Sequence, residues 1–67
     1  MENRTLVHTT SYEHVATMLR DKLEAAGINV LILDQHDSIS EVIGGWEIHV
    51  NDEDAEEAKK IVDQVTR

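Results

Sequence analysis

Histidines and carboxylates are the residue types of this chain that could do chemistry, and its four histidines are His8, His14, His36 and His49. Imidazoles bind transition metals, but a competent site needs three or four ligands and ordered contacts behind them. No histidines here have the local spacing of a metal motif. Only His8 and His49, on two strands expected to be neighbours, could approach each other. We predict no metal site.

Asp34, His36 and Asp37 could form an acid–base cluster, although carboxylates after a strand are typical of turns, where they bond their own backbone. The chain has no cysteine, and it contains no G-x-S-x-G nucleophile motif. Gly44 and Gly45 precede a strand and lack the pattern of a phosphate loop. A pocket of about 300 Å³ is also hard to build in so small a core. We therefore expect no enzymatic activity, no catalytic residue and no cofactor.

The charge balance excludes some partners, because fourteen carboxylates face six lysines and arginines and the net charge is −8. Few cations are available for phosphate contacts, which disfavours nucleic acids and anionic membrane surfaces. Acidity favours solubility, or a basic partner. The longest apolar run, residues 30–33, is too short to span a bilayer, and the start has no secretory pattern. We expect a cytoplasmic protein.

Two segments, residues 10–26 and 51–66, have apolar residues at helical spacing. In the first, Thr10 and Glu13 have the spacing of a capping box, and Gly27 is placed for a left-handed C-terminal cap. Its expected buried stripe consists of Tyr12, Val15, Ala16, Leu19, Leu23 and Ala26, with Met18 on its shoulder.

The second helical segment is expected to begin with Asn51 or Asp52 as its cap. The acidic run 52–57 then lies at the positive end of the helix dipole. A cation site is the alternative, but the run lacks the oxygen-ligand loop that calcium needs. The expected buried stripe consists of Ala55, Ala58, Ile61, Val62 and Val65.

Three short runs, residues 5–8, 28–34 and 46–50, are typical of strands. Residues 46–50 alternate between apolar and polar, as in a strand with one buried face. Trp46 lies on the same side of this strand as its apolar residues, so we expect it in the core. The alternative is that Trp46 is exposed and binds a partner. Residues 28–34 are apolar on both parities, so we expect both faces of that strand to be covered.

The order strand, helix, strand, strand, helix predicts an α+β fold in one domain, residues 1–67. Right-handed connections place both helices on one face of the sheet. The expected structure is a two-layer ferredoxin-like βαββα sandwich with a three-stranded antiparallel sheet of order 1-3-2. The fourth strand of that fold is missing, which leaves a bare edge beside the first strand.

The helices should cover Val30, Ile32 and the apolar side of residues 46–50, which leaves the other side of the sheet open. Burying an exposed leucine is worth about 1.5–3 kcal/mol, so a cover is expected there. It could be the 35–45 connection, with Ile39, Val42 and Ile43, or a second subunit. We predict a homodimer that uses this side or the bare edge of the first strand. We call this side the reverse face, and its predicted members are Leu31, Leu33, Glu47, His49 and either Leu6 or Val7, with Leu6 preferred.

The residues also resemble a small bacterial family described as putative prokaryotic signal-transducing protein. The likeness covers nearly the whole chain: Thr9, Thr10, Glu13, Leu19, Leu23 and residues 25–28, then residues 45–55 and Ala58. It implies a split βαβ fold similar to that of nitrogen-regulatory PII proteins, and it brings no catalytic residues. The cysteine-rich tail of some relatives and the long effector loop of PII proteins have no counterpart here.

The predicted function is that of a small regulatory or signal-transducing module that acts through self-association or contacts with another protein. The alternative is a small-ligand sensor similar to amino-acid-binding regulatory domains, with its ligand near the first helix and the loop before it. A ligand bound only by the folded state would raise its stability and so distinguish the two.

Overall fold

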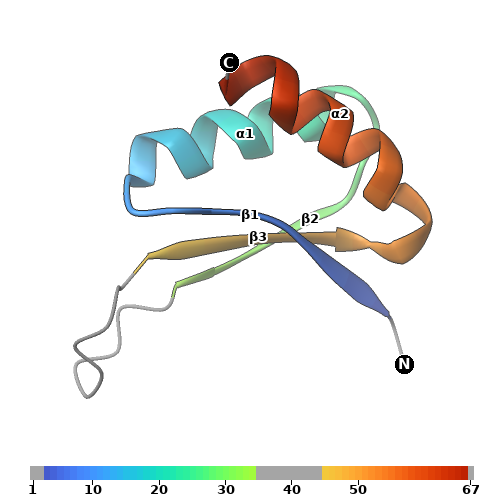
Figure 1. Ribbon diagram of the computed structural model, residues 1–67, viewed down its shortest axis with the longest axis horizontal. Helices are drawn as coiled ribbons and strands as arrows, with labels where there is room; N and C mark the ends of the chain where they lie inside the picture. Colours follow the sequence, from blue (N-terminus) through green and yellow to red (C-terminus); the bar gives the residue numbers. More distant parts are fainter. Residues whose placement is uncertain (1–2, 35–44, 67) are drawn as a thin grey trace.

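The computed structural model describes residues 3–34 and 45–66, so most of the predicted 35–45 connection, with Ile39, Val42 and Ile43, lies outside the described residues. The elements are β1 (Arg4–Thr10), α1 (Glu13–Ala25), β2 (Val30–Asp34), β3 (Trp46–Asn51), a short 3-10 helix (Asp52–Asp54) and α2 (Ala55–Thr66). The sheet has the order β1-β3-β2, with β3 antiparallel to both neighbours. Both helices lie on one side of it (Figure 1). The predicted α+β βαββα arrangement is confirmed.

The hydrophobic core lies between the helices and the sheet, and β3 contributes its centre. Ile48 and Val50 are 0% exposed, as are Leu19 and Leu23 of α1. Trp46 is half-buried and packs against this core, which confirms its expected position. The other buried apolar residues are Ala16, Ile28, Ala58 and Val62.

The C-terminal end of α1 is held as the sequence predicts. Gly27 has a φ of 84°, in the left-handed region that an L side chain adopts only with strain. Its amide donates to the Glu24 carbonyl, and the Ile28 amide donates to the Leu23 carbonyl. These two bonds form a Schellman motif, with Ile28 and Leu23 as its apolar contact. The motif ends α1 and leads the chain into β2.

The predicted capping box at the start of α1 is wrong. β1 continues to Thr10, which pairs with Trp46 of β3 and therefore stays extended. The Thr10 hydroxyl accepts a hydrogen bond from the Tyr12 amide, at 3.1 Å, and the helix begins at Glu13 without a side-chain cap. The carbonyl of Thr10 also lies close to β3: a Cβ at Gly45 would stand 2.7 Å from that oxygen, so only glycine fits there.

Two helix positions also differ from the prediction. Tyr12 is 63% exposed because it precedes α1 rather than belonging to its buried stripe, and Ala26 follows the helix and is exposed. α2 begins at Ala55, later than expected, because Asn51 still pairs with Arg4 in the sheet. The Asn51 side chain makes no capping bond. The apolar stripe of α2 is confirmed: Ala58 and Val62 are buried, and Ala55, Ile61 and Val65 are half-buried.

A β-bulge in β1 decides which of its side chains face the helices. Leu6 pairs with His49 and His8 pairs with Ile48, so the register shifts at Val7. Two successive β1 residues therefore stand opposite one residue of β3. Val7 packs against the core, whereas Leu6 is 45% exposed. The bulge resolves the choice between Leu6 and Val7 in favour of Leu6 on the reverse face.

Candidate interaction surface

The reverse face is the side of the sheet that neither helix covers, and it consists of Leu6, Leu31, Leu33, Glu47 and His49. Cross-strand partners point to the same side of a sheet, so the register fixes which residues meet there. Read from β1 across β3 to β2, the two rows are Leu6–His49–Leu31 and Thr9–Glu47–Leu33.

The leucines of this face are the exposed apolar surface of the sheet. Leu6 is 45% exposed and Leu31 is 36% exposed, while Leu33 is half-buried. No helix or strand of the described residues packs over them (Figure 1). Exposed apolar patches on small proteins often mark contact sites. We expected both sides of β2 to be covered. Within the described residues, only the side that faces the helices is covered.

A polar pair lies between the leucines at the centre of the face. The Nε2 atom of His49 is 3.1 Å from the Oε1 atom of Glu47, and the two side chains are 18% and 32% exposed. The residues are two apart on β3, so they point the same way. An imidazole that carries a proton on Nε2 donates it to the carboxylate. Because the pair is half-buried beside leucines, any partner on this face must accommodate it.

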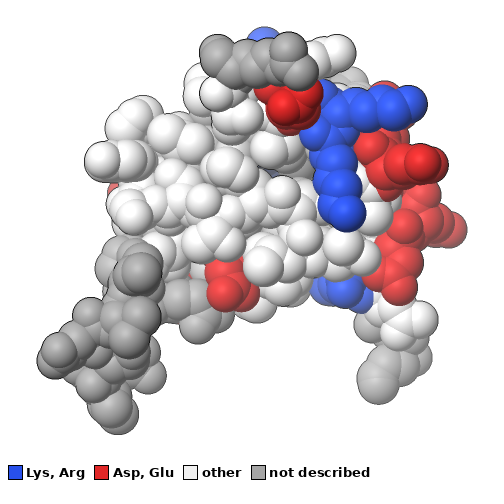
Figure 2. Space-filling model, viewed as in Figure 1, with Lys and Arg blue, Asp and Glu red and all other residues white. Residues whose placement is uncertain are grey.

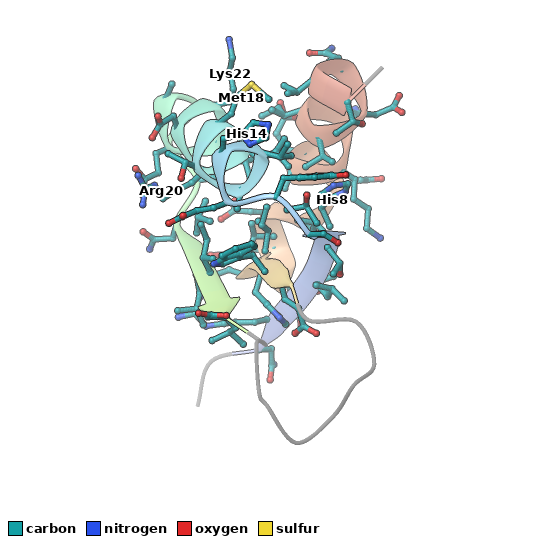
Figure 3. The ribbon with its side chains drawn as sticks, turned by 90° about the vertical axis from the view of Figure 1, so that its left-hand side faces the viewer. His8, His14, Met18, Arg20 and Lys22 are labelled. Atoms are coloured by element: carbon teal, nitrogen blue, oxygen red, sulfur yellow. The ribbon has the colours of Figure 1, made fainter. Side chains whose placement is uncertain are left out.

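The histidines do not converge. His8 pairs with Ile48 and so stands on the helix side of the sheet, away from His49. Figure 3 shows His8 beside α2 and His14 on the outer side of α1. The bulge therefore separates the two histidines that the sequence could have brought together. Within the described ranges, no group of three or more histidine or carboxylate side chains could hold a metal ion.

The proposed acid–base cluster is described only at Asp34. That residue is exposed and pairs with Trp46 at the end of β2. His36 and Asp37 lie outside the described residues.

Among the described residues, a hollow of about 570 Å³ is lined by residues on the outer side of α1. Figure 3 shows His14, Met18 and Lys22 in a row along this side of the helix. Met18 is 41% exposed, and the ring of Tyr12 lies tilted against that of His14, with ring centres 5.7 Å apart. A second hollow, about 330 Å³, is lined by Asn3, Asn51, Asp52 and Glu53.

Charges gather at one end of the molecule. Figure 2 shows the carboxylates concentrated where α2 begins, with lysine and arginine side chains beside them and a broad uncharged surface elsewhere in this view. The run 52–57 precedes and opens α2, where negative charge complements the helix dipole. Asp52 also accepts a hydrogen bond from the Thr5 hydroxyl. These contacts give the run a structural role.

The sequence matches the model of a family described as putative prokaryotic signal transducing protein over residues 5–66. The chain belongs to this family. The family match therefore spans every strand and helix of the sandwich, from β1 to α2. No curated protein and no solved structure matches the chain. Over the described residues of this family member, no helix is long and apolar enough to cross a membrane.

Sequence reasoning missed the pairing of Glu47 with His49 and the exposed row on α1. The first had a signal, because residues two apart on a strand share a face. The second had one as well, because His14, Met18 and Lys22 are spaced by four residues, which aligns them on one side of a helix.

Proposed function

We propose that this family member is a non-enzymatic, cytoplasmic interaction module that acts by self-association through its reverse face. The observation that carries the proposal is the leucine surface of exposed Leu6 and Leu31 and half-buried Leu33, on a sheet side without a described cover. Burying such side chains against a second copy supplies the driving force for association. A signalling role fits a contact that forms and breaks with conditions.

The reverse face is the part of the surface on which two copies can meet with little charge repulsion. The chain has a net charge of −8, so two copies repel each other over most of their surfaces. The carboxylate of the reverse face, Glu47, already has an imidazole beside it. Two such faces therefore meet without bringing together unpaired carboxylates. Higher salt should strengthen this contact, because it screens the repulsion between the anionic copies.

The face is preferred over the free edge of β1. Edge strands pair with other strands through an unbroken row of amides and carbonyls, and a bulge interrupts that row. The bulge at Val7 lies within β1 itself. Edge-to-edge pairing of two copies would have to cross that irregularity, whereas the reverse face remains continuous over three strands.

The size of the face predicts a weak complex. β2 provides five residues, and three strands of that length cover about 17 by 14 Å at normal strand spacing. Stable dimers bury about 800 Å² on each partner, which is more than this footprint offers. We expect association in the micromolar range, as in transient signalling contacts.

The Leu31→Lys variant tests this proposal, with Met18→Lys as its matched control. Both changes add one positive charge at a residue of similar exposure, 36% for Leu31 and 41% for Met18, but Met18 lies on α1. By sedimentation equilibrium, we expect the parent and Met18→Lys to form dimers at high micromolar concentration and Leu31→Lys to remain monomeric. A parent that stays monomeric at that concentration contradicts the proposal, as does equal weakening by both variants.

The second candidate function is that of a small-ligand sensor. It is supported by the hollow on the outer side of α1, because such a ligand is expected near the first helix and the loop before it. Ligand pockets enclose most of their ligand, whereas this hollow lies open on one helix. A thermal-shift series with amino acids and nucleotides tests it. A reproducible rise in melting temperature that is lost in Met18→Lys would favour the sensor, and unchanged melting favours the interaction module.

A further inference from the structure

We propose that two copies meet in one orientation, in which His49 of each copy lies over Glu47 of the other, and that association consequently takes up protons. This inference rests on the proposed function and adds the geometry and the regulation of the contact. It starts from the polar pair at the centre of the reverse face, where Nε2 of His49 and Oε1 of Glu47 are 3.1 Å apart.

Symmetry limits how two such faces stack. If the two sheets pack with their strands aligned, the two-fold axis between them runs either across the strands or along them. An axis across the strands, level with Ile48, places each His49 over Glu47 of the second copy, because these residues lie on either side of Ile48. It also places Leu31 over the partner's Leu33, since these residues pair with His49 and Glu47. An axis along β3 would instead stack Glu47 on Glu47 and His49 on His49.

The first arrangement is favoured because like charges that face each other in a desolvated contact are costly. Crossed pairing gives each carboxylate two imidazoles, one from its own chain and one from the partner. It also places apolar side chains against apolar side chains on β2. Glu47 and His49 of one copy thus complement His49 and Glu47 of the other.

Burial of this arrangement favours the protonated imidazole. A carboxylate taken out of water without a cation is strongly destabilising, whereas a protonated histidine beside it restores charge balance. Histidine is the side chain whose charge changes between about pH 5 and 8. If the dimer binds more protons than two monomers, linkage requires association to tighten as pH falls. Two copies can take up as many as two protons.

Few other charges face the pair among the described residues. On β1, the outward neighbours are Leu6 and Thr9, and Arg4 lies one pair further along, opposite Asn51. On β2, the outward neighbours are leucines, and Asp34 pairs with Trp46 on the helix side. His8 stands on the helix side as well. Glu47 and His49 are therefore the titratable groups nearest to the centre of the contact.

The test measures the dimer dissociation constant by sedimentation equilibrium at constant salt, between pH 8 and pH 6. The parent is expected to tighten about tenfold over this range, as an average uptake of about half a proton per dimer across two pH units would give. Glu47→Gln should associate more tightly than the parent at pH 8 and lose most of the pH dependence, because no carboxylate needs a cation. His49→Gln should be weaker than the parent at pH 6 and also lose the dependence.

His14→Gln is the matched control, since it removes one imidazole from the outer side of α1, far from the face (Figure 3). It should keep the parent's pH dependence, which separates proton uptake at the pair from the general loss of negative charge. Circular dichroism checks that each variant folds, and Glu47→Gln alone suffices if His49→Gln does not fold.

Dimers whose pH dependence persists in both pair variants would overturn this inference and leave the proposed function intact. Dimers that weaken as pH falls would overturn it too. The absence of dimers at every pH would remove both.

Discussion

The two faces of β3 differ in how their side chains are satisfied, although they alternate along one six-residue strand. On the helix side, Ile48 and Val50 are 0% exposed and belong to the apolar core. On the reverse face, Glu47 and His49 retain 32% and 18% exposure and form a pair between leucines. One side is covered by the helices, and the other has no cover among the described residues.

The comparison separates the residues that fill the core from the residues that would carry the proposed contact, on opposite sides of the same sheet. Ile48 and Val50 have no water to lose in a later contact, so their substitution affects folding. Residues of the reverse face keep part of their water, so their substitution affects association first. The three predictions below concern the free energy of unfolding and are ordered from the largest expected effect to the smallest.

The largest effect is expected for Ile48→Ala. Removing methyl groups from a filled core lowers the free energy of unfolding by about 2–5 kcal/mol. Leu31→Ala, on the reverse face, should change it by about 0.5 kcal/mol, as is usual for surface sites. Urea denaturation at low micromolar concentration, where monomers dominate, gives both values. Equal losses in the two variants would contradict the division between the faces.

An intermediate effect is expected for Gly27→Ala, which tests how α1 is held over the covered face. The added Cβ meets no atom within 4 Å, so the cost comes from the backbone, whose φ is 84°. Left-handed backbone costs an L residue about 1–2 kcal/mol, and thermal or urea unfolding measures it.

Gly27→Asn is the control for that substitution, because asparagine tolerates the left-handed region better than alanine. It should lose less stability than Gly27→Ala. If both variants unfold like the parent, the Schellman motif does not hold α1 in the way described.

The smallest effect on folding is expected for Glu47→Gln. Partly exposed ion pairs contribute about 0–1 kcal/mol, so the unfolding free energy of the monomer should change by less than about 1 kcal/mol at pH 6. Urea denaturation at low concentration checks this, beside the larger effect on dimers at pH 8. A loss as large as that of Ile48→Ala would show that the pair belongs to the core of the monomer.

Local patterns predict most of this fold. The alternation of residues 46–50, the helical spacing of Leu19 and Leu23, and Gly27 after the first helix each report a local requirement, and each is confirmed. The sheet order follows from the sequence of elements and the handedness of their connections. The outward positions of Leu31 and His49 follow from the same alternation.

The errors arise where tertiary pairing competes with a local motif. Thr10 and Glu13 fit a capping box, but pairing with Trp46 keeps Thr10 in the sheet. Asn51 fits a helix cap, but Arg4 holds it in β3. No residue type predicts the bulge, because the position of a bulge depends on how two strands pair. For that reason the separation of His8 from His49 needed the structure.

The single extra residue in β1 has a consequence for how this surface could change over time. It shifts the alternation of the strand. Even-numbered residues face outward in the first half of the strand, whereas Thr9 faces outward in the second half. Deleting Val7 would remove the extra residue and leave Leu6 opposite His49 and His8 opposite Ile48. The outward leucine would thus survive a one-residue deletion there, whereas the core would lose one apolar side chain.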